Sequence, residues 1–314
     1  MSNQTIVVTG GTGFIGRHFL ADLPSESVRV RALSRNPDMA AVTHPGIEWI
    51  AGDLADSDSW KRLLEPGCTV VNLAYSSTET IEQAVASTTT MVKACAEMKI
   101  ARLVHCSTIS VYGRTWGGVI DEQTPCKPID DYGRRKLAIE QAVQLHRGFE
   151  LLVLRPSAVF GSGGQGLRAL CTSLREGSRL TNYLRSSLFG SRQMHLVRVE
   201  TVVAALRMLC NLQRTVDHEV FIVAEDHEPH NNFRDVERLL MSALGVPDYP
   251  IAPLPIPSAV LGLMLRARGR SEVDPHCIYS AAKLQEWGFA PSQGFSGAIQ
   301  LFAQVQSSKV GASA

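Results

Sequence analysis

The sequence lacks a charge excess, a long apolar run and internal repeats. Its 31 Lys and Arg residues nearly balance 30 Asp and Glu residues and are spread along the chain. We therefore expect no nucleic acid and no membrane surface as partner. No apolar run approaches the ~20 residues that span a bilayer, and the immediate entry into a strand pattern leaves no room for a signal peptide. These absences predict a cytoplasmic protein.

Metal-binding spacings are also missing. The cysteines occur singly, in no metal or CxxC spacing, and are expected to be reduced and mostly buried. Four histidines likewise lack metal spacing and are expected at the surface: His195, His218, His227 and His230. We predict no metal site.

Short apolar strands separated by helices dominate the first half of the chain. The expected strands are Ile6–Thr9, Val28–Leu33, Glu48–Ala51, Thr69–Leu73, Arg102–Cys106 and Leu151–Arg155. The helices between them are expected to begin near Phe14, Ser57, Glu82 and Tyr132. This alternation predicts an α/β fold whose parallel sheet is covered by helices on both faces. Such a sheet binds its ligand beyond the carboxyl ends of its strands.

The second half is less regular, and residues 161–190 are rich in Gly, Ser and Arg. Further on we expect strands at Met194–Val199 and Glu219–Val223, helices over 200–213 and Asn232–Leu244, and a proline-rich loop reaching Pro257. A chain of 314 residues can hold such a smaller lobe beside the main sheet. A basic cluster could contact a nucleotide diphosphate or solvent: Arg266, Arg268 and Arg270.

Residues 5–16, TIVVTGGTGFIG, place three glycines directly after a buried strand. Gly10 allows a tight turn, Gly13 allows the backbone to approach a pyrophosphate, and Gly16 lets the next helix pack closely on the strand. That helix would point its unpaired N–H groups and its positive dipole end at the phosphates. The position of the trio after a strand predicts a nucleotide site.

Two further positions follow strands where a dinucleotide fold meets adenosine. Arg35, after the second strand, can accommodate a 2′-phosphate and so favours NADP over NAD, although it could also be a solvated loop residue. Asp53, followed by Leu54, suits a hydrogen bond to the adenine amino group, and it could also cap the helix near Ser57. After the fourth strand, Leu73 and the small Ala74 would let the cofactor lie flat against the sheet.

A third group could carry acid–base chemistry. Ser107 and Thr108 follow the fifth strand, and Tyr132 and Lys136 are four residues apart, so on a helix they share one face. A phenol with a pKa of ~10 is a poor catalyst at neutral pH. A nearby ammonium and the charge of an oxidised nicotinamide would stabilise the phenolate, and Thr108 could hydrogen-bond the same substrate oxygen.

The order TGGTGFIG, GDL, NLA, STISVYG, YGRRK and LRPSAVFG resembles the extended branch of the short-chain dehydrogenase/reductase family, the NAD-dependent epimerases, dehydratases and reductases of nucleotide sugars. The resemblance implies a doubly wound parallel sheet, the Rossmann fold, over residues 1–160 with returns near 194–224. It also implies a smaller interleaved C-terminal substrate domain from 161–193 and 225–304, with a tail at 305–314.

Carried over by position, Tyr132 resembles the family's catalytic base, Lys136 its cofactor-ribose and pKa partner, and Thr108 its substrate-oxygen hydroxyl. The resemblance implies NAD or NADP as cofactor. The positions that match its cofactor site are Gly10, Gly13, Phe14, Ile15, Gly16, Arg35, Asp53, Leu54, Leu73, Ala74 and Ser107, together with Tyr132 and Lys136. Relatives often dimerise through the helix that carries Tyr132 and Lys136, which implies a possible homodimer.

The chain also departs from the family pattern. Ile109-Ser110 stands where 4,6-dehydratases carry an Asp-Glu pair, which disfavours that elimination. Ser157 and Ala158 stand where nucleotide-sugar members often have Asn, and Arg192 is the candidate for a diphosphate contact. Trp116 and the Gly117-Gly118 pair either line the mouth of the pocket or form a hairpin.

Three functions follow from these residues. The first is a nucleotide-sugar 4-epimerase or 4-ketoreductase that acts on a secondary alcohol or ketone. The second is an NADP-dependent reductase or dehydrogenase of a non-nucleotide substrate, of a sterol-, flavonol- or polyketide-like kind. The third, a non-catalytic dinucleotide-binding protein, is opposed by the intact set of Thr108, Tyr132 and Lys136.

Overall fold

The computed structural model describes residues 4–24, 28–113, 118–145, 148–254, 276–291 and 293–311. Trp116, Gly117 and the basic cluster at Arg266, Arg268 and Arg270 lie outside these ranges. None of the described helices is both long and apolar enough to cross a membrane.

Seven strands of the described chain form one sheet, in the order β10-β7-β5-β4-β1-β2-β3. Every neighbouring pair in it is parallel. The strands are β1 (Gln4–Thr9), β2 (Val28–Ser34), β3 (Glu48–Ala51), β4 (Thr69–Asn72), β5 (Arg102–Cys106), β7 (Glu150–Pro156) and β10 (His218–Val223). The strand order reverses between β1 and β4, which is where open α/β sheets bind ligands. The predicted doubly wound Rossmann-like sheet is confirmed.

Helices cover both faces of this sheet because successive strand side chains point to opposite sides. Ile6 and Val8 of β1 pack with α1 (Phe14–Asp22) and α8 (Val199–Cys210). Val7, between them, packs on the other face, in the core that α3 (Ser57–Leu63), α4 (Ile81–Glu97) and α5 (Asp131–Gln144) complete. Burying each such aliphatic side chain stabilises the fold by about 1.5–3 kcal/mol. Short helices lie beside the edge strands: α2 (Pro37–Thr43) and α11 (Ala282–Glu286).

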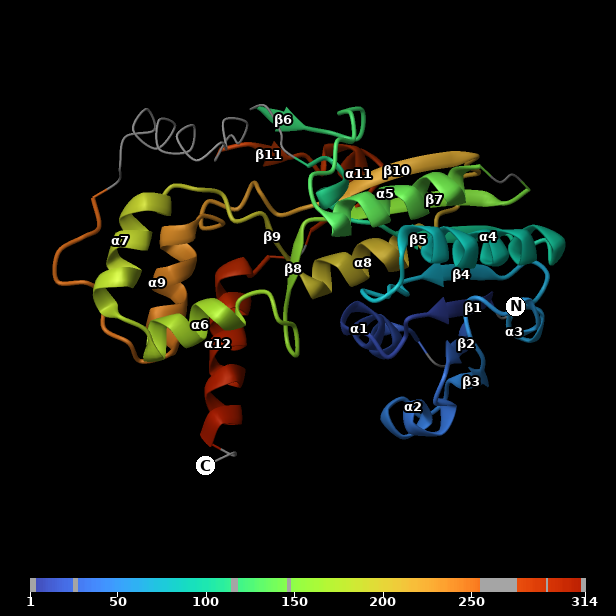
Figure 1. The fold of residues 1–314 in the computed structure, drawn as a ribbon, viewed down its shortest axis with the longest axis horizontal. Coiled ribbons are helices and arrows are strands. Elements are labelled where there is room, and N and C mark those ends of the chain that lie inside the picture. Colours follow the sequence, from blue (N-terminus) through green and yellow to red (C-terminus); the bar gives the residue numbers. More distant parts are fainter. Residues whose placement is uncertain are drawn as a thin grey trace.

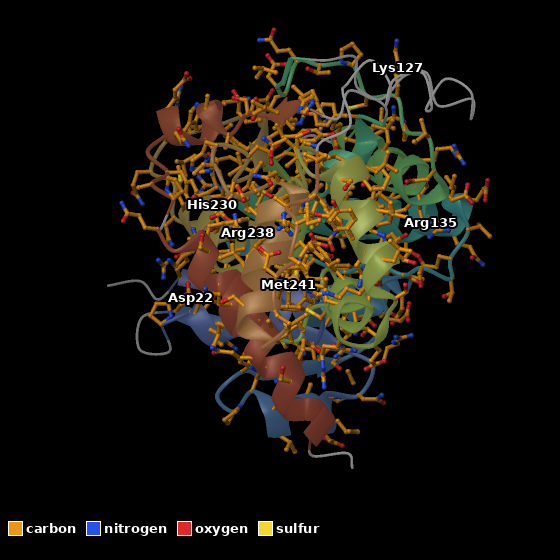
Figure 2. The ribbon with its side chains drawn as sticks, turned by 90° about the vertical axis from the view of Figure 1, so that its left-hand side faces the viewer. Asp22, Lys127, Arg135, His230, Arg238 and Met241 are labelled. Atoms are coloured by element: carbon orange, nitrogen blue, oxygen red, sulfur yellow. The ribbon has the colours of Figure 1, made fainter. Side chains whose placement is uncertain are left out.

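A second lobe stands beyond the carboxyl ends of the strands (Figure 1). It consists of α6 (Arg168–Glu176), α7 (Arg179–Phe189), α9 (Phe233–Ala243) and α12 (Phe295–Gly311). These helices share an apolar core of their own that includes Leu174, Val236 and Ile299. Figure 2 looks onto this lobe, where His230, Arg238 and Met241 help to line a cleft of about 470 Å³ beside α9.

Short strand pairs connect the lobe to the main sheet. β8 (Ala158–Phe160) pairs with β9 (Leu196–Arg198), and β6 (Val119–Ile120) pairs with β11 (Ile278–Tyr279). The predicted strand at Met194–Val199 is thus shorter and pairs with β8 instead of returning to the main sheet. The last helix runs to Gly311 and includes most of the segment where a tail was expected.

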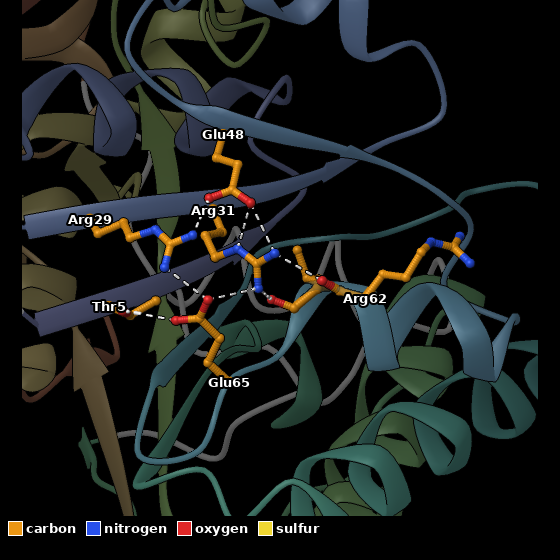
Figure 3. A network of polar contacts seen from close by, with 7 residues as sticks. Thr5, Arg29, Arg31, Glu48, Arg62 and Glu65 are labelled. Carbon is orange, nitrogen blue, oxygen red and sulfur yellow. Dashed lines mark hydrogen bonds and ion pairs between the residues drawn. The ribbon is translucent and has the colours of Figure 1, made fainter.

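Charged residues tie the amino ends of β2 and β3 together (Figure 3). Arg29 and Arg31 both pair with Glu48, at 2.7 and 3.0 Å, and Arg29 pairs with Glu65 at 2.9 Å. Arg31 is buried and also donates to the carbonyl of Leu63 at the end of α3. This network lies at the end of the strands opposite the glycine turn, where it holds β2, β3 and the end of α3 together.

Candidate active site

The glycine turn joins β1 to α1 with almost no space around two of its glycines. Gly10 has φ +69°, and a Cβ there would lie 2.7 Å from the backbone of Leu73 and Ala74. A Cβ on Gly16 would lie 2.1 Å from the carbonyl oxygen of Gly10. The turn, the end of β4 and the first turn of α1 are therefore packed backbone to backbone.

Gly13 differs from the other two. It is the N-cap of α1 with φ −73°, and a Cβ there would approach only the carbonyl of Gly10, at 3.1 Å. No described side chain caps the helix at this point, so the N–H groups of Phe14 and Ile15 have no side-chain partner. An uncapped helix start behind an exposed glycine fits a pyrophosphate.

A second glycine-rich segment, residues 161–164, covers this first turn of α1. A Cβ on Gly164 would lie 2.7 Å from the ring of Phe14, and the carbonyl of Ser162 is 2.9 Å from His18 Nε2. The segment connects β8 to the lobe, so the lobe is joined to the main domain through contacts with α1. The glycine-rich run GSGGQG was a sequence signal for this close contact with α1, but it was not used to predict one.

The two positions predicted to meet adenosine are exposed. Arg35 is exposed directly after β2, and Asp53 is exposed after the neighbouring β3; Gly52 N–H donates to the carbonyl of Ser34 at 3.2 Å. The cap of α3 is Asp56, whose carboxylate accepts from Asp58 and Ser59. The alternative that Asp53 caps this helix is therefore wrong; the Asp53 carboxylate accepts from Ala55 N–H at 2.9 Å instead. Leu54 is half-buried beside it, and its carbonyl accepts from Trp60 at 2.8 Å.

Thr108, Tyr132 and Lys136 come together at the carboxyl end of β5. Lys136 is buried and its Nζ donates to the carbonyl of Cys106 at 2.9 Å. Thr108 is buried, and its hydroxyl donates to Ser110 Oγ at 3.3 Å; it also lies near enough to the Tyr132 phenol, which is 40% exposed, to lower the pKa of that phenol. Close packing makes this possible: a Cβ on Gly133 would lie 2.5 Å from the carbonyl of Ser110. The predicted convergence of the three side chains is present in the structure.

The electrostatics differ from the expectation. Burial raises the pKa of the Tyr132 phenol above its ordinary value, and the hydrogen bond with Thr108 opposes the rise without cancelling it. Burial also lowers the pKa of Lys136. The prediction that this ammonium draws the phenol toward neutral pH is not supported by the chain's own groups, because burial of the phenol has the largest effect on its pKa and raises it. The positive charge of an oxidised nicotinamide would have to supply the remainder.

Tyr75 is a neighbour of Tyr132 and Lys136 that sequence reasoning missed. Its ring packs edge-on against Tyr132, with centroids 5.2 Å apart, and Lys136 Nζ lies 5.0 Å from its centre. Arg135 donates to its hydroxyl at 2.9 Å and to the carbonyls of Ser76 and Ser77. The loop after β4 is thereby held on α5, and the position of Tyr75 directly after NLA was the available signal.

Unpaired hydroxyls mark the ends of β5 and β7. Among the described residues, the buried hydroxyls of Ser107 and Ser157 have no hydrogen-bond partner. An unsatisfied buried hydroxyl costs about 1–3 kcal/mol, which a bound ligand can recover. Both lie where the sequence predicts contacts, Ser107 with the cofactor and Ser157 with the substrate. Together with the uncapped start of α1, they show that the residues present fit a dinucleotide.

A buried polar chain lies beneath these hydroxyls. Thr9 donates to Asn72 at 2.6 Å, and the Asn72 amide lies 3.1 Å from His105 Nδ1. Burial, with a smaller effect from the charge of Lys136, lowers the pKa of His105 to about 3. His105 is therefore neutral at physiological pH and links β1, β4 and β5 without adding charge.

Two residues named in the sequence analysis lie away from this cluster: Arg192, the candidate for a diphosphate contact, and His195, an expected surface histidine. Arg192 is exposed on the lobe; its guanidinium is 5.9 Å from the centre of the Phe189 ring, and its carbonyl accepts from Phe233 N–H. No contact of the described chain joins Arg192 to the three converging side chains. His195 is mostly buried and bonded to Asp226, so its expected surface position is wrong.

Comparison with known proteins agrees with this geometry. Residues 6–224 match the family model "NAD dependent epimerase/dehydratase family". A dTDP-6-deoxy-L-talose 4-dehydrogenase (NAD(P)(+)) of Kitasatospora kifunensis is 37% identical over 177 residues, 51% of this chain and 54% of that protein. A UDP-glucose 4-epimerase of Azospirillum brasilense is 24% identical over 216 residues, 61% of this chain and 60% of that protein. The chain spans about half the length of the curated relatives it matches.

Solved structures show the same fold. The Bordetella bronchiseptica enzyme WbmG in complex with NAD and UDP has a TM-score of 0.72 at 20% identity, covering 96% of this chain and 92% of that one. The UDP-Glc/GlcNAc 4-epimerase from Campylobacter jejuni has a TM-score of 0.71 at 19% identity, covering 98% and 99%. At these identities the structures establish the fold and not the activity. The family match over the strands, turns and helix that build the site is decisive: the chain belongs to the NAD dependent epimerase/dehydratase family.

Proposed function

We propose that this protein is an NAD(P)-dependent oxidoreductase or epimerase that acts on a secondary alcohol or ketone, most specifically as a nucleotide-sugar 4-epimerase or 4-ketoreductase. The observation that carries the proposal is the convergence of Thr108, Tyr132 and Lys136 beside the uncapped glycine turn. Family membership supports NAD(P) as cofactor. Relatives that act on dTDP- and UDP-sugars support the substrate class.

In the proposed reaction, each side chain has one task. Tyr132 accepts the proton of the substrate hydroxyl, or returns it to the ketone oxygen, while the Thr108 hydroxyl holds that oxygen. Lys136, held by the carbonyl of Cys106, supplies positive charge beside the phenolate and a donor for the cofactor ribose. A bound nicotinamide would supply the hydride acceptor or donor for this reaction. If the ketone rotates within the site before it is reduced, the product is an epimer. If the ketone is released, the enzyme acts as a dehydrogenase.

We assign the cofactor preference to Arg35, whose exposed position after β2 suits a 2′-phosphate. The test is the dissociation constant for NADPH and for NADH in the wild type and in Arg35→Gln. The proposal expects the substitution to weaken NADPH binding at least tenfold, about 1.4 kcal/mol, and to leave NADH binding unchanged. An equal effect on both cofactors would remove Arg35 from the 2′-phosphate site. Arg62, exposed on α3 and bonded to the carbonyl of Ala51, provides a matched control arginine.

A second candidate is an NADP-dependent reductase of a non-nucleotide substrate. The observation in its favour is the buried hydroxyl of Ser157 at a position where nucleotide-sugar relatives often carry an amide. Thermal unfolding with UDP, GDP, dTDP or CDP separates the two candidates, because a ligand at 100 times its dissociation constant adds ~2.7 kcal/mol to the folded state. Stabilisation by one nucleoside diphosphate favours the sugar substrate. Its absence with all of them favours the second candidate.

A further inference from the structure

A carboxylate, an imidazole and a thiol meet outside the Thr108–Tyr132–Lys136 cluster. His195 precedes β9, Asp226 follows β10 and Cys277 directly precedes β11. His195 Nδ1 lies 2.6 Å from Asp226 Oδ2, and Cys277 Sγ lies 3.6 Å from His195 Nε2. We call these three residues the Cys277 triad. No group of His, Cys, Asp and Glu in the described chain could hold a metal ion, so the chemistry of the triad is that of the thiol.

Asp226 fixes the imidazole of His195 in one tautomer. Its side chain is fully buried, and Oδ2 also accepts the backbone N–H of Tyr279 at 2.8 Å. An ionised carboxylate can only accept, so Nδ1 of His195 donates to it. Nε2 then faces Cys277 as an acceptor for the thiol proton. The Tyr279 ring packs edge-on against the imidazole, with centroids 4.9 Å apart, and keeps it in this plane.

The backbone also holds His195 in a strained conformation. Its φ is +51°, the left-handed region that costs a non-glycine residue about 1–2 kcal/mol. Bonds on both sides impose it: the His195 carbonyl accepts from Ala158 N–H at 2.8 Å, and Asn231 bonds to both Met194 and Leu196. Strain that the surroundings over-determine is typical of functional positions. The contact with Ala158 places the triad next to Ser157, the residue that precedes Ala158 in the chain.

Charge favours transfer of the thiol proton. Burial alone would lower the pKa of His195, but the bonds to Asp226 and Cys277 outweigh it and raise the pKa to about 9. For the other six cysteines, burial raises the pKa of the thiol, which keeps them protonated and unreactive. Cys277 lies against a histidine that can take its proton.

We propose that Cys277 is a redox modification site that is oxidised by hydrogen peroxide, with His195 as proton acceptor and donor and Asp226 as the positioning residue. Because Cys277 is only 4% exposed, the oxidant has to be small. His195 takes the thiol proton, and the thiolate sulfur attacks one peroxide oxygen. The S–O bond forms as the O–O bond breaks, and the imidazolium gives its proton to the departing hydroxide. The sulfur loses two electrons, the peroxide gains them, and the products are a sulfenic acid and water.

The experiment compares thiols within one protein, and therefore does not depend on the proposed enzyme function. The full chain is exposed to hydrogen peroxide, the reaction is stopped with catalase, and the denatured protein is alkylated and mapped by mass spectrometry. The rate at which each cysteine loses its free thiol is measured. Cys126 is the matched control, because it is more exposed than Cys277. We expect Cys277 to be oxidised at least tenfold faster than Cys126.

Two variants assign the effect to the triad. His195→Asn keeps a residue type that tolerates positive φ, and Asp226→Asn keeps the shape of the carboxylate. Both are expected to slow the oxidation of Cys277 at least tenfold and to leave Cys126 unchanged, which also reports that the fold is intact. Oxidation of Cys277 no faster than that of Cys126 in the wild type would overturn the proposal. An unchanged Cys277 rate in His195→Asn would overturn it as well.

Discussion

Replacing Gly13 with alanine is expected to separate cofactor binding from folding. Its φ of −73° suits any residue, and an added Cβ meets only the carbonyl of Gly10, at 3.1 Å, so that oxygen has to shift by a few tenths of an ångström. The loss of a good N-cap and the smaller entropy of the unfolded chain nearly cancel, leaving a net change within about 1 kcal/mol. The methyl group would nevertheless stand where the phosphates approach α1, and we expect at least a tenfold loss of NADPH affinity, about 1.4 kcal/mol.

Gly10→Ala provides the contrast. Its φ of +69° costs an alanine about 1–2 kcal/mol, and the Cβ would lie 2.7 Å from the backbone of Leu73 and Ala74, adding overpacking of about 1–3 kcal/mol. The free energy of unfolding should therefore fall by about 2–5 kcal/mol. Urea unfolding and NADPH titration of both variants are the assays. Gly13→Ala with wild-type NADPH affinity, or Gly10→Ala with wild-type stability, would refute this interpretation of the turn.

Three further outcomes are expected. Tyr132→Phe should lower kcat/KM by about 10²–10⁴-fold with little change in stability; unchanged turnover of the native substrate would remove the phenol from the mechanism. Tyr75→Ala should destabilise the fold in urea by about 1–2 kcal/mol through loss of its ring contacts, whereas Tyr75→Phe keeps the rings and should lose about 1 kcal/mol or less; equal losses would contradict this division. Because the fold raises the pKa of His195 from 6.5 to about 9, its contribution to stability is complete below pH 6.5 and is lost as the pH rises through 9. The free energy of unfolding of the wild type should fall more than that of His195→Asn over that pH range. Parallel curves of stability against pH would argue against a stabilising role of protonated His195.

The sequence predicts the main sheet well because its signals there are local. The run from Thr5 into the glycine turn combines a buried strand with glycines that no other residue could replace at Gly10 and Gly16. Tyr132 and Lys136 share one face of α5 because they are four residues apart, and this spacing can be read directly from the sequence. Their pKa values could not be predicted in the same way, because burial depends on everything that packs around them.

The lobe was harder to predict because its contacts join distant parts of the chain. The strand at Leu196–Arg198 pairs with β8, and its register is set by tertiary neighbours. His195 depends on Asp226 and Cys277, which lie 31 and 82 residues away. Tyr75 is bound by Arg135, 60 residues further along the chain. No periodicity connects such pairs, and only the folded chain brings them together.

Hydrogen–deuterium exchange with and without saturating NADPH tests the central claim most directly, because it locates the cofactor without a known substrate. Our account predicts slower amide exchange at three separated places at once: residues 10–16, residues 73–75 and the first turns of α5 that carry Tyr132 and Lys136. The same protection with NADH would place either cofactor in this site. Unchanged exchange at all three places under saturating NADPH would contradict the account.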